Sequence, residues 1–240
     1  MRVKLLGFEI DNYSLEEAVL KAEEYLLSGK IAQVVTINPE MFECAQSDQY
    51  FASIINESEI IIPDGVGVKI ALKLNGINAN RIPGIDFAKK MLEISAQKGC
   101  KVAIIGAKED VITAAIKNLK NELNDLNIVY YRNGYFTEDE VVYSELSNAA
   151  PDLILAAMGS PRQEKFIYGL KKVLNKGVMI GIGGSLDVWS GMVKRAPLLF
   201  QRTGTEWLYR TVTQPSRFKR IFPTLPLFLI KVLKYKYVKK

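Results

Sequence analysis

The feature that most constrains the fold is a series of short apolar runs, each ending in a loop that contains glycine or proline. Runs of about 4–8 apolar residues bounded by such loops are typical of buried strands. Residues 111–123, which follow one of these runs, have apolar side chains at helical spacing. This alternation of strand, loop and helix predicts an α/β fold with a parallel or mostly parallel sheet covered by helices. The expected strands cover residues 33–37, 59–62, 101–106, 152–158 and 177–182.

The loops after these expected strands are rich in glycine and polar residues. In open sheets of parallel strands, ligands bind beyond the carboxyl ends of the strands, so these loops are the expected binding site. They read TINPE at 36–40, PDGVG at 63–67, GAKED at 106–110, GSPRQE at 159–164 and GIGGSLD at 181–187. The last two loops lack a full dinucleotide fingerprint, and therefore indicate a phosphate or nucleotide site only weakly.

Charge is divided unevenly along the chain. Residues 1–193 contain 20 Lys and Arg against 25 Asp and Glu, whereas residues 194–240 contain 12 Lys and Arg and a single acidic residue, Glu206. The net charge of +6 therefore comes entirely from the C-terminal segment. We expect two units: a catalytic body at 1–193 and a basic, amphipathic helical appendage at 194–240.

The C-terminal segment, residues 194–240, interleaves basic residues with aromatic and apolar ones. Its apolar run at 222–233 is interrupted by two prolines and a lysine. That run falls short of the roughly 20 apolar residues that cross a bilayer. Three interpretations fit: association with an anionic membrane surface, nucleic-acid binding, or an ordinary helix with a solvated basic face. We favour the membrane surface and expect no nucleic-acid partner.

The N-terminal residues have neither the apolar run nor the small-residue cleavage site of a secretory signal. We therefore expect a peripheral protein on the cytoplasmic face of the cell membrane. In that reducing compartment Cys44 and Cys100, which lack metal-ligand spacing, are interpreted as small buried hydrophobic residues.

The chain contains no histidine, the commonest general base and metal ligand. Acid–base chemistry must therefore fall to carboxylates, lysine or tyrosine. An Asp-x-Asp pair of the kind that holds a divalent metal on a nucleotide sugar is also absent from the sequence. We expect neither a metal site nor a cofactor.

Asp64 is the first candidate among the carboxylates. It follows an expected strand and stands beside Gly65 and Gly67, where the backbone can approach a ligand closely. A carboxylate there can accept a proton from a sugar hydroxyl. The alternative is structural, since aspartate in a Pro-Asp-Gly sequence often stabilises a turn. Spacing alone leaves both interpretations open.

Thr36 lies near the end of the strand at 33–37 and Asn38 directly follows this strand. The two are separated by one residue, so their side chains are expected to point into the same cleft. A hydroxyl and an amide suit the recognition of uracil or a sugar. Asn38 is equally suited to capping a helix that begins near Glu40. Gln163, in the loop at 159–164, offers an amide that can both donate and accept hydrogen bonds.

If the ligand is a nucleotide sugar, its diphosphate must be stabilised as it leaves, and without a metal or histidine this task would fall to arginine. Arginine binds phosphate through two hydrogen bonds and a permanent charge. The C-terminal segment supplies Arg195, Arg202, Arg210, Arg217 and Arg220. We expect some of them to close over the active site when this segment meets the membrane.

Six sequence blocks occur in a recognisable order. They are T-x-N-P-E at 36–40, D-G-x-G at 64–67, R-x-x-G-x-D at 81–86, G-S-P-R-Q-E at 159–164, G-x-G-G-x-x-D at 181–187, and G-x-x-x-R-A-P at 191–197 running to E-W-L-Y-R at 206–210. In this order they resemble the WecG/TagA/CpsF glycosyltransferase family, and most closely its TagA branch. The resemblance covers nearly the whole chain, from Val3 to about Arg220.

The resemblance implies a Rossmann-like body with helices on both faces of the sheet, and an inverting, metal-independent transferase. The TagA branch moves N-acetylmannosamine from UDP to the 4-hydroxyl of N-acetylglucosamine on undecaprenyl diphosphate, a step in the synthesis of wall teichoic acid. The implied partners are a UDP-sugar donor, the lipid-linked acceptor and the membrane surface.

Carried over residue by residue, the resemblance makes Asp64 the general base and assigns Arg210, Arg217 and Arg220 to stabilising the diphosphate. The expected substrate-binding residues are Thr36, Asn38, Arg81, Gln163, Gly183, Asp187 and Arg195.

Several alternatives stay open at this point. The donor could be N-acetylmannosaminuronic acid or another UDP-sugar, and a homo-oligomer could cover the apolar C-terminal segment. Tyr131, Arg132 and Tyr135 are interpreted as loop residues in preference to nucleotide contacts. A Rossmann-like oxidoreductase and a non-catalytic membrane-surface adaptor are the alternatives from other functional classes, and neither explains the ordered polar loops.

Overall fold

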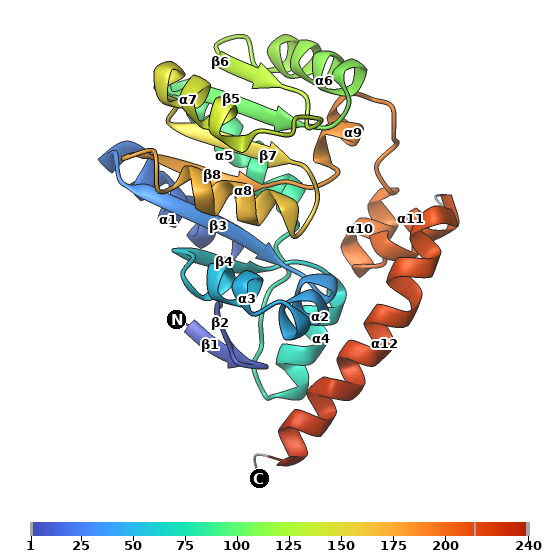
Figure 1. Ribbon diagram of the computed structural model, residues 1–240. Coiled ribbons are helices and arrows are strands. Elements are labelled where there is room, and N and C mark those ends of the chain that lie inside the picture. Colours follow the sequence, from blue (N-terminus) through green and yellow to red (C-terminus); the bar gives the residue numbers. More distant parts are fainter. Residues whose placement is uncertain (1, 214, 239–240) are drawn as a thin grey trace.

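The computed structural model describes residues 2–213 and 215–238, including their side chains except those of 210–211, 213, 215–223 and 237–238 (Figure 1). A six-stranded sheet forms its centre, in the strand order β4-β3-β8-β7-β5-β6. The strands are β3 (Ile31–Ile37), β4 (Ile60–Pro63), β5 (Lys101–Gly106), β6 (Asn127–Arg132), β7 (Leu153–Ala157) and β8 (Gly177–Gly181). Every neighbouring pair is parallel, so the expected α/β fold is confirmed.

Helices cover both faces of this sheet (Figure 1). One face carries α1 (Leu15–Ser28), α5 (Gly84–Lys98), α6 (Glu109–Glu122) and α9 (Ser185–Trp189). The other carries α2 (Pro39–Ser47), α3 (Gln49–Asn56), α7 (Asp139–Ala149) and α8 (Arg162–Leu170). Successive strand residues alternate between the two layers: Val34 packs with the first set of helices and Val35 with the second. The central strands are therefore buried on both sides, as their continuous apolar runs predict.

A short antiparallel hairpin, β1 (Arg2–Leu5) and β2 (Phe8–Asp11), precedes the sheet. The buried carboxylate of Asp11 attaches it to the sheet. This carboxylate accepts a hydrogen bond of 2.8 Å from the backbone N–H of Ile61 in β4 and pairs with Arg2 at 3.1 Å. Charged residues interrupt both strands of this hairpin, so neither has the continuous apolar run from which the other strands were predicted.

The edge strand β6 corrects one sequence interpretation. Tyr131 and Arg132 lie in this strand and not in a loop, while Tyr135 lies just beyond it and is exposed. Residues along β6 alternate between exposed and half-buried, so this strand has no continuous apolar run. The two cysteines also differ from expectation, because Cys44 and Cys100 are half-buried at the margins of the core.

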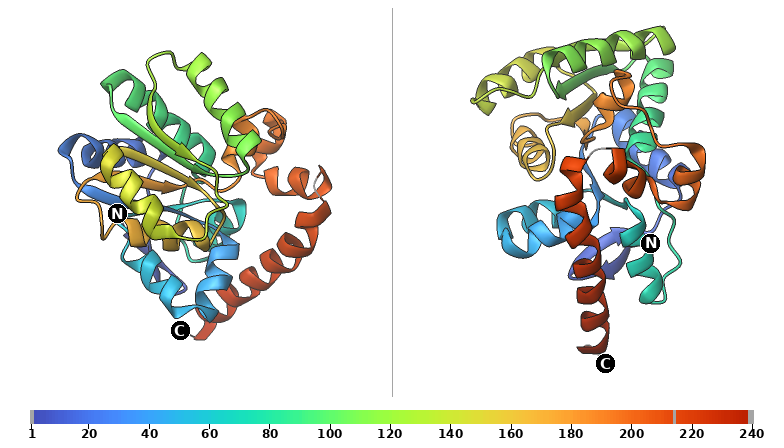
Figure 2. Two further views of the ribbon diagram at one scale, coloured as in Figure 1. Left: turned by 45° about the horizontal axis from the view of Figure 1, so that its top comes forward. Right: turned by 90° about the vertical axis from the view of Figure 1, so that its right-hand side faces the viewer.

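The C-terminal segment forms α10 (Leu198–Thr203), α11 (Glu206–Thr213) and the long α12 (Pro215–Val238). Helix α12 runs down one flank of the body and packs against α2 and α4 (Val66–Leu74) (Figures 1 and 2). Phe228 and Val232 are fully buried there, with the Phe228 ring centroid 5.1 Å from that of Phe42. Within residues 2–213 and 215–238, no helix combines the length and apolar character needed to span a membrane.

Candidate active site

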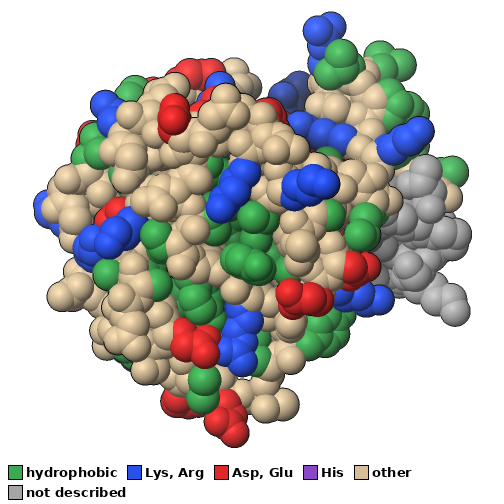
Figure 3. Space-filling view, turned by 90° about the horizontal axis from the view of Figure 1, so that it is seen from above, with side chains coloured by type: hydrophobic (Ala, Val, Ile, Leu, Met, Phe, Trp, Pro, Cys, Tyr) green, Lys and Arg blue, Asp and Glu red, His purple; other side chains and the backbone are tan. Residues whose placement is uncertain are grey.

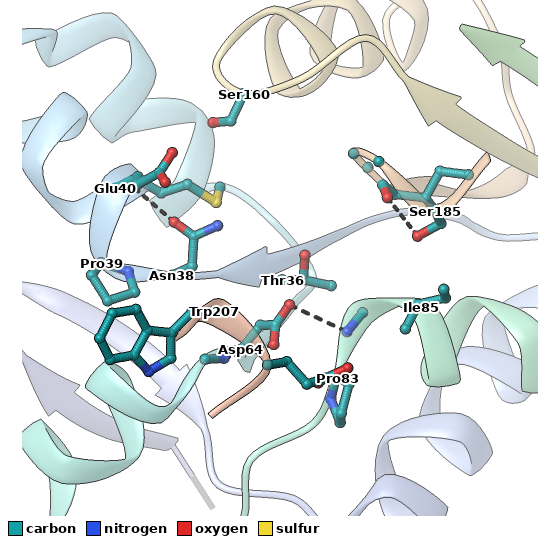
Figure 4. A pocket seen from close by; sticks show the side chains of 18 of the residues that line it. Thr36, Asn38, Pro39, Glu40, Asp64, Pro83, Ile85, Ser160, Ser185 and Trp207 are labelled. Atoms are coloured by element: carbon teal, nitrogen blue, oxygen red, sulfur yellow. Dashed lines mark hydrogen bonds between the residues drawn. The ribbon is translucent and has the colours of Figure 1, made fainter. Parts of the chain in front are cut away.

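A pocket of about 490 Å³ lies at the carboxyl end of the sheet, where the loops after β3, β4, β7 and β8 converge (Figure 4). Strands β3 and β8 are neighbours, but the helices that follow them, α2 and α9, cover opposite faces of the sheet. A crevice opens where successive connections diverge in this way, and that is where open α/β sheets bind ligands. The C-terminal segment completes the wall of the pocket with Gly204, Glu206, Trp207, Thr224 and Leu225.

Asp64 lies directly after β4 and faces the pocket, with 29% of its side chain exposed. Its two carboxylate oxygens accept hydrogen bonds from the backbone N–H groups of Gly65 at 2.6 Å and Gly84 at 3.3 Å (Figure 4). Burial raises the pKa of the Asp64 carboxyl, while Arg81 and the two N–H groups lower it by a smaller amount. The carboxylate therefore orders its turn, as the structural interpretation expects, and it also opens onto the pocket; its role as a base stays a prediction.

Gly67 brings three elements close together beside Asp64. A Cβ atom on this glycine would lie 2.5 Å from the side chain of Leu225 in α12 and 2.7 Å from that of Pro39 in α2. Such distances are too short for non-bonded carbon atoms, so a larger residue would push these helices apart. The glycine of the D-G-x-G block thus sets the approach of the C-terminal helix to the site.

Thr36 and Asn38 both line the pocket, as their spacing predicts. Asn38 is also the N-cap of α2, since its side-chain oxygen accepts a 3.0 Å hydrogen bond from the N–H of Met41. Thr36 packs against the first residue of α5: a Cβ on Gly84 would lie 3.2 Å from Cγ2 of Thr36. The capping role and the pocket position of Asn38 are therefore compatible.

Gln163 lines the pocket at the start of α8, and both ends of its amide are held. Its oxygen accepts a 3.0 Å hydrogen bond from the N–H of Gly183, and its nitrogen donates to Glu164 at 2.7 Å. Glu164 is buried, which raises its pKa, and its backbone carbonyl accepts a bond from the buried side chain of Gln33. Glu164 was not among the expected site residues, although it stands in the G-S-P-R-Q-E block.

Arg81 lies between the body and the C-terminal segment. Its Nε is 3.8 Å from a carboxylate oxygen of Asp64, and its terminal nitrogens donate to the backbone carbonyl of Gln201, at 3.3 Å, and to the carboxylate of Glu206. Arg195 is not among the residues that line the pocket. It lies behind Glu206, with its Nε 3.5 Å from the Glu206 carboxylate and its terminal nitrogens paired with Asp86 at 2.6 and 2.8 Å.

The remaining expected site residues are placed as follows. Gly183 and Asp187 line the pocket, whereas Tyr131, Arg132 and Tyr135 do not. Arg210, Arg217 and Arg220 lie in α11 and α12, and their side chains are outside the described residues. Among the described residues, no three His, Cys, Asp or Glu side chains are grouped so that they could hold a metal ion. The catalytic and binding roles of all these residues stay predictions.

Comparison with known proteins identifies the family. The model of the glycosyl transferase WecG/TagA/CpsF family matches residues 3–240. The chain belongs to the WecG/TagA/CpsF family. It is therefore a glycosyltransferase, and the resemblance carried by the six ordered blocks is confirmed.

Three curated relatives share the name N-acetylglucosaminyldiphosphoundecaprenol N-acetyl-beta-D-mannosaminyltransferase. The protein of Bacillus subtilis strain 168 is 36% identical over 231 residues, covering 95% of this chain and 90% of the relative. That of Bacillus spizizenii is 37% identical over 213 residues, covering 88% and 82%. That of Staphylococcus aureus strain NCTC 8325 is 32% identical over 238 residues, covering 98% and 93%.

Proposed function

We propose that this chain transfers N-acetylmannosamine from UDP to the 4-hydroxyl of N-acetylglucosamine on undecaprenyl diphosphate, with inversion and without a metal. The step would serve the linkage unit of wall teichoic acid. The observation that carries the proposal is Asp64, a carboxylate at a strand end that faces a pocket closed by the C-terminal segment. The shared activity name of the relatives supports the choice of donor sugar and acceptor.

Asp64 would act as the general base. The acceptor hydroxyl gives its proton to Asp64 as its oxygen bonds to the anomeric carbon, and the bond from that carbon to the diphosphate breaks on the opposite face. UDP leaves with the bonding electron pair, so a single displacement inverts the configuration. The raised pKa of Asp64 supports this role, because a base is most effective when its pKa approaches the working pH. The hydrogen bonds from Gly65 and Gly84 would fix its orientation.

The leaving diphosphate would be stabilised by arginines of the C-terminal segment. Of the charged side chains described in the pocket lining, four are acidic and one, Arg81, is basic, and Arg81 is bound by Glu206. Arg210 and Arg220 each stand four residues from a lining residue of the same helix, Glu206 and Thr224 respectively. Residues at this spacing are neighbours along a helix, which supports the assignment of Arg210 and Arg220 to the diphosphate; Arg217 is assigned on the family resemblance alone.

N-acetylmannosaminuronic acid is placed second among the donors, because the curated relatives are named for the transfer of N-acetylmannosamine.

The acceptor's polyprenyl chain stays in the bilayer, so the enzyme must work at a membrane surface. We assign that contact to the C-terminal segment, which combines a charge balance of 12 basic residues to one acidic with exposed apolar side chains. Anionic lipids attract each basic residue by about 1 kcal/mol, and apolar side chains add insertion energy. The exposed apolar residues are Leu198, Leu199, Leu208, Val212, Leu227, Ile230 and Leu233. We propose that this attachment is peripheral and at the cytoplasmic face of the membrane.

The deciding experiment measures UDP release from UDP-N-acetylmannosamine by the full-length chain, with a lipid-diphosphate N-acetylglucosamine acceptor in detergent, with and without a chelator. We expect release that needs the acceptor and survives the chelator, and NMR of the product should show an inverted anomeric centre. Turnover of UDP-N-acetylmannosaminuronic acid in its place would overturn the donor. Binding of UDP without turnover of either donor would favour the adaptor.

A further inference from the structure

Glu206 is the sole acidic residue among positions 194–240, and it is one of the most buried residues of that segment, with 8% of its side chain exposed. A buried carboxylate is costly unless it is paired, so its partners define why it is there. Its ion-pair partners among the described side chains are two arginines. Arg81 comes from the loop between α4 and α5, and Arg195 comes from the loop between α9 and α10.

The charges around Glu206 alternate in sign across the site. Asp64 faces Arg81, Arg81 is bound by Glu206, Glu206 faces Arg195, and Arg195 is held through two nitrogens by Asp86. The chain of contacts therefore begins at the candidate base and passes through the C-terminal segment. It returns to the body at Asp86 in α5.

The geometry of Arg81 shows which carboxylate it favours. Two of its nitrogens donate to Gln201 and Glu206, both in the C-terminal segment. Its third nitrogen, Nε, faces Asp64 at 3.8 Å, is buried, and has no hydrogen-bond acceptor among the described residues. Arg81 is thus engaged by the C-terminal segment and lies just beyond hydrogen-bonding distance of Asp64.

We propose that Glu206 is a positioning residue that anchors the C-terminal segment at the site and holds Arg81 back from Asp64, leaving Asp64 available to accept a proton. This inference rests on the proposed function, which makes Asp64 the base. If Glu206 loses its charge, Arg81 can turn its guanidinium toward Asp64 and bind it. A carboxylate bound in that way is a weaker base, so docking of the C-terminal segment would prepare the base as well as enclose the substrate.

The proposal predicts opposite shifts for two substitutions. Asp64 must be deprotonated to act, so turnover rises with pH through its pKa. Glu206→Gln removes a negative charge near Asp64 and frees Arg81, and both changes lower the pKa of Asp64 because they favour its charged form. The rise of kcat with pH on the acidic side of the profile, the acid limb, should therefore move to lower pH by about one unit, which is a tenfold change in proton affinity. Arg81→Gln removes the cation and should move the limb to higher pH.

Among the described side chains, the charged groups that act on Asp64 from neighbouring elements are Arg81 and Glu206, and the N–H groups of Gly65 and Gly84 also contact it. Glu40 of α2 and Asp187 of α9 line the same pocket. None of the proposed substitutions alters these last two carboxylates, so their influence on Asp64 is common to every variant.

Glu43→Gln is the matched control. Glu43 in α2 pairs with Lys231 of α12 at 2.5 Å, so it also joins the body to the C-terminal segment, but it does not line the pocket. This variant removes an equal charge and loosens the same segment. The acid limb of its kcat profile should coincide with that of the wild-type protein, even if its maximal kcat is lower.

The experiment records kcat against pH for the full-length wild-type protein and the three variants, with the detergent-solubilised acceptor. A uniform fall in turnover for Glu206→Gln, with an unmoved acid limb, would overturn the proposal and leave Glu206 a structural anchor. Carbon-13 NMR titration of Asp64 in the same proteins decides the point if a variant is inactive. The proposal requires a lower pKa in Glu206→Gln and fails if the value is unchanged. Absence of transfer by the wild-type protein would defeat the proposed function. The NMR titration would still test whether Glu206 and Arg81 control the pKa of Asp64.

Discussion

The body and the C-terminal segment contribute walls of different character to the same pocket. The body supplies loops fixed at the ends of fully buried strands, and these loops bring Asp64, Gln163 and Asp187 into the lining. Charged side chains of both signs are spread over the face of the molecule seen in Figure 3. The C-terminal segment has a large positive excess and many exposed apolar residues. In the proposed function the body places the base, and the basic C-terminal segment meets phosphate and lipid.

The largest expected effect tests the body's part in this division. Asp64→Asn keeps the shape of the side chain but removes its ability to take up a proton, so kcat should fall by about 10²–10⁴. Acceptor-dependent UDP release measures the fall, and thermal unfolding checks the fold. Asp125→Asn, at an exposed position outside the pocket, removes the same charge and should leave turnover unchanged. Near-wild-type turnover by folded Asp64→Asn would remove Asp64 from the base role.

The next prediction tests whether the two regions fold separately. Phe228 of α12 is fully buried against Phe42 of α2, so Phe228→Ala should lower the free energy of unfolding by about 3–5 kcal/mol. Its neighbour Leu227 is 51% exposed, and Leu227→Ala should change that free energy by about 0.5 kcal/mol or less. Denaturant unfolding followed by circular dichroism measures both. A separate early transition in Phe228→Ala, with the main transition unmoved, would show that α12 unfolds independently of the body.

The sequence predicted the central strands because each is buried on both faces and therefore reads as an apolar run. It missed β6 because this strand, unlike the buried edge strand β4, alternates between exposed and half-buried residues and carries Tyr131 and Arg132. The pocket positions of Thr36, Asn38, Asp64 and Gln163 followed from their places at the ends of parallel strands.

The contacts of Glu206 and Glu164 could not be derived from the sequence in the same way. Glu206 and its partner Arg81 are separated by 125 positions, and only the folded chain brings them together. Gln33, which donates to the backbone of Glu164, is separated from it by 131 positions. Local patterns locate residues at strand ends, whereas partners of buried charges depend on tertiary packing.

The third prediction tests the part assigned to the C-terminal arginines. Arg217→Ala should lower kcat by about 10²–10³, the usual cost of losing one donor that stabilises developing charge. Arg202→Ala removes the same charge from the same segment at an exposed position outside the pocket lining, and should have a small effect. Steady-state UDP release by both full-length variants makes the comparison. Equal losses in the two would mean that the segment acts through its overall charge and not through an individual arginine.

The smallest expected effect concerns the membrane, where the C-terminal segment would act without the body. Ile230 is 49% exposed on α12. Placing a half-exposed isoleucine in the lipid interface should contribute about 1 kcal/mol to the free energy of membrane binding, since full burial of such a side chain is worth about 1.5–3 kcal/mol. Ile230→Gln should therefore weaken sedimentation with anionic phosphatidylglycerol vesicles several-fold, and added salt should weaken binding of both proteins by screening. Leu20 on α1 is 60% exposed on the body, so Leu20→Gln serves as the control and should bind like the wild-type protein. If both substitutions weaken binding equally, or neither does, the exposed apolar face of α12 is not the surface that meets the bilayer, and the positive charge of the segment would have to provide the attachment alone.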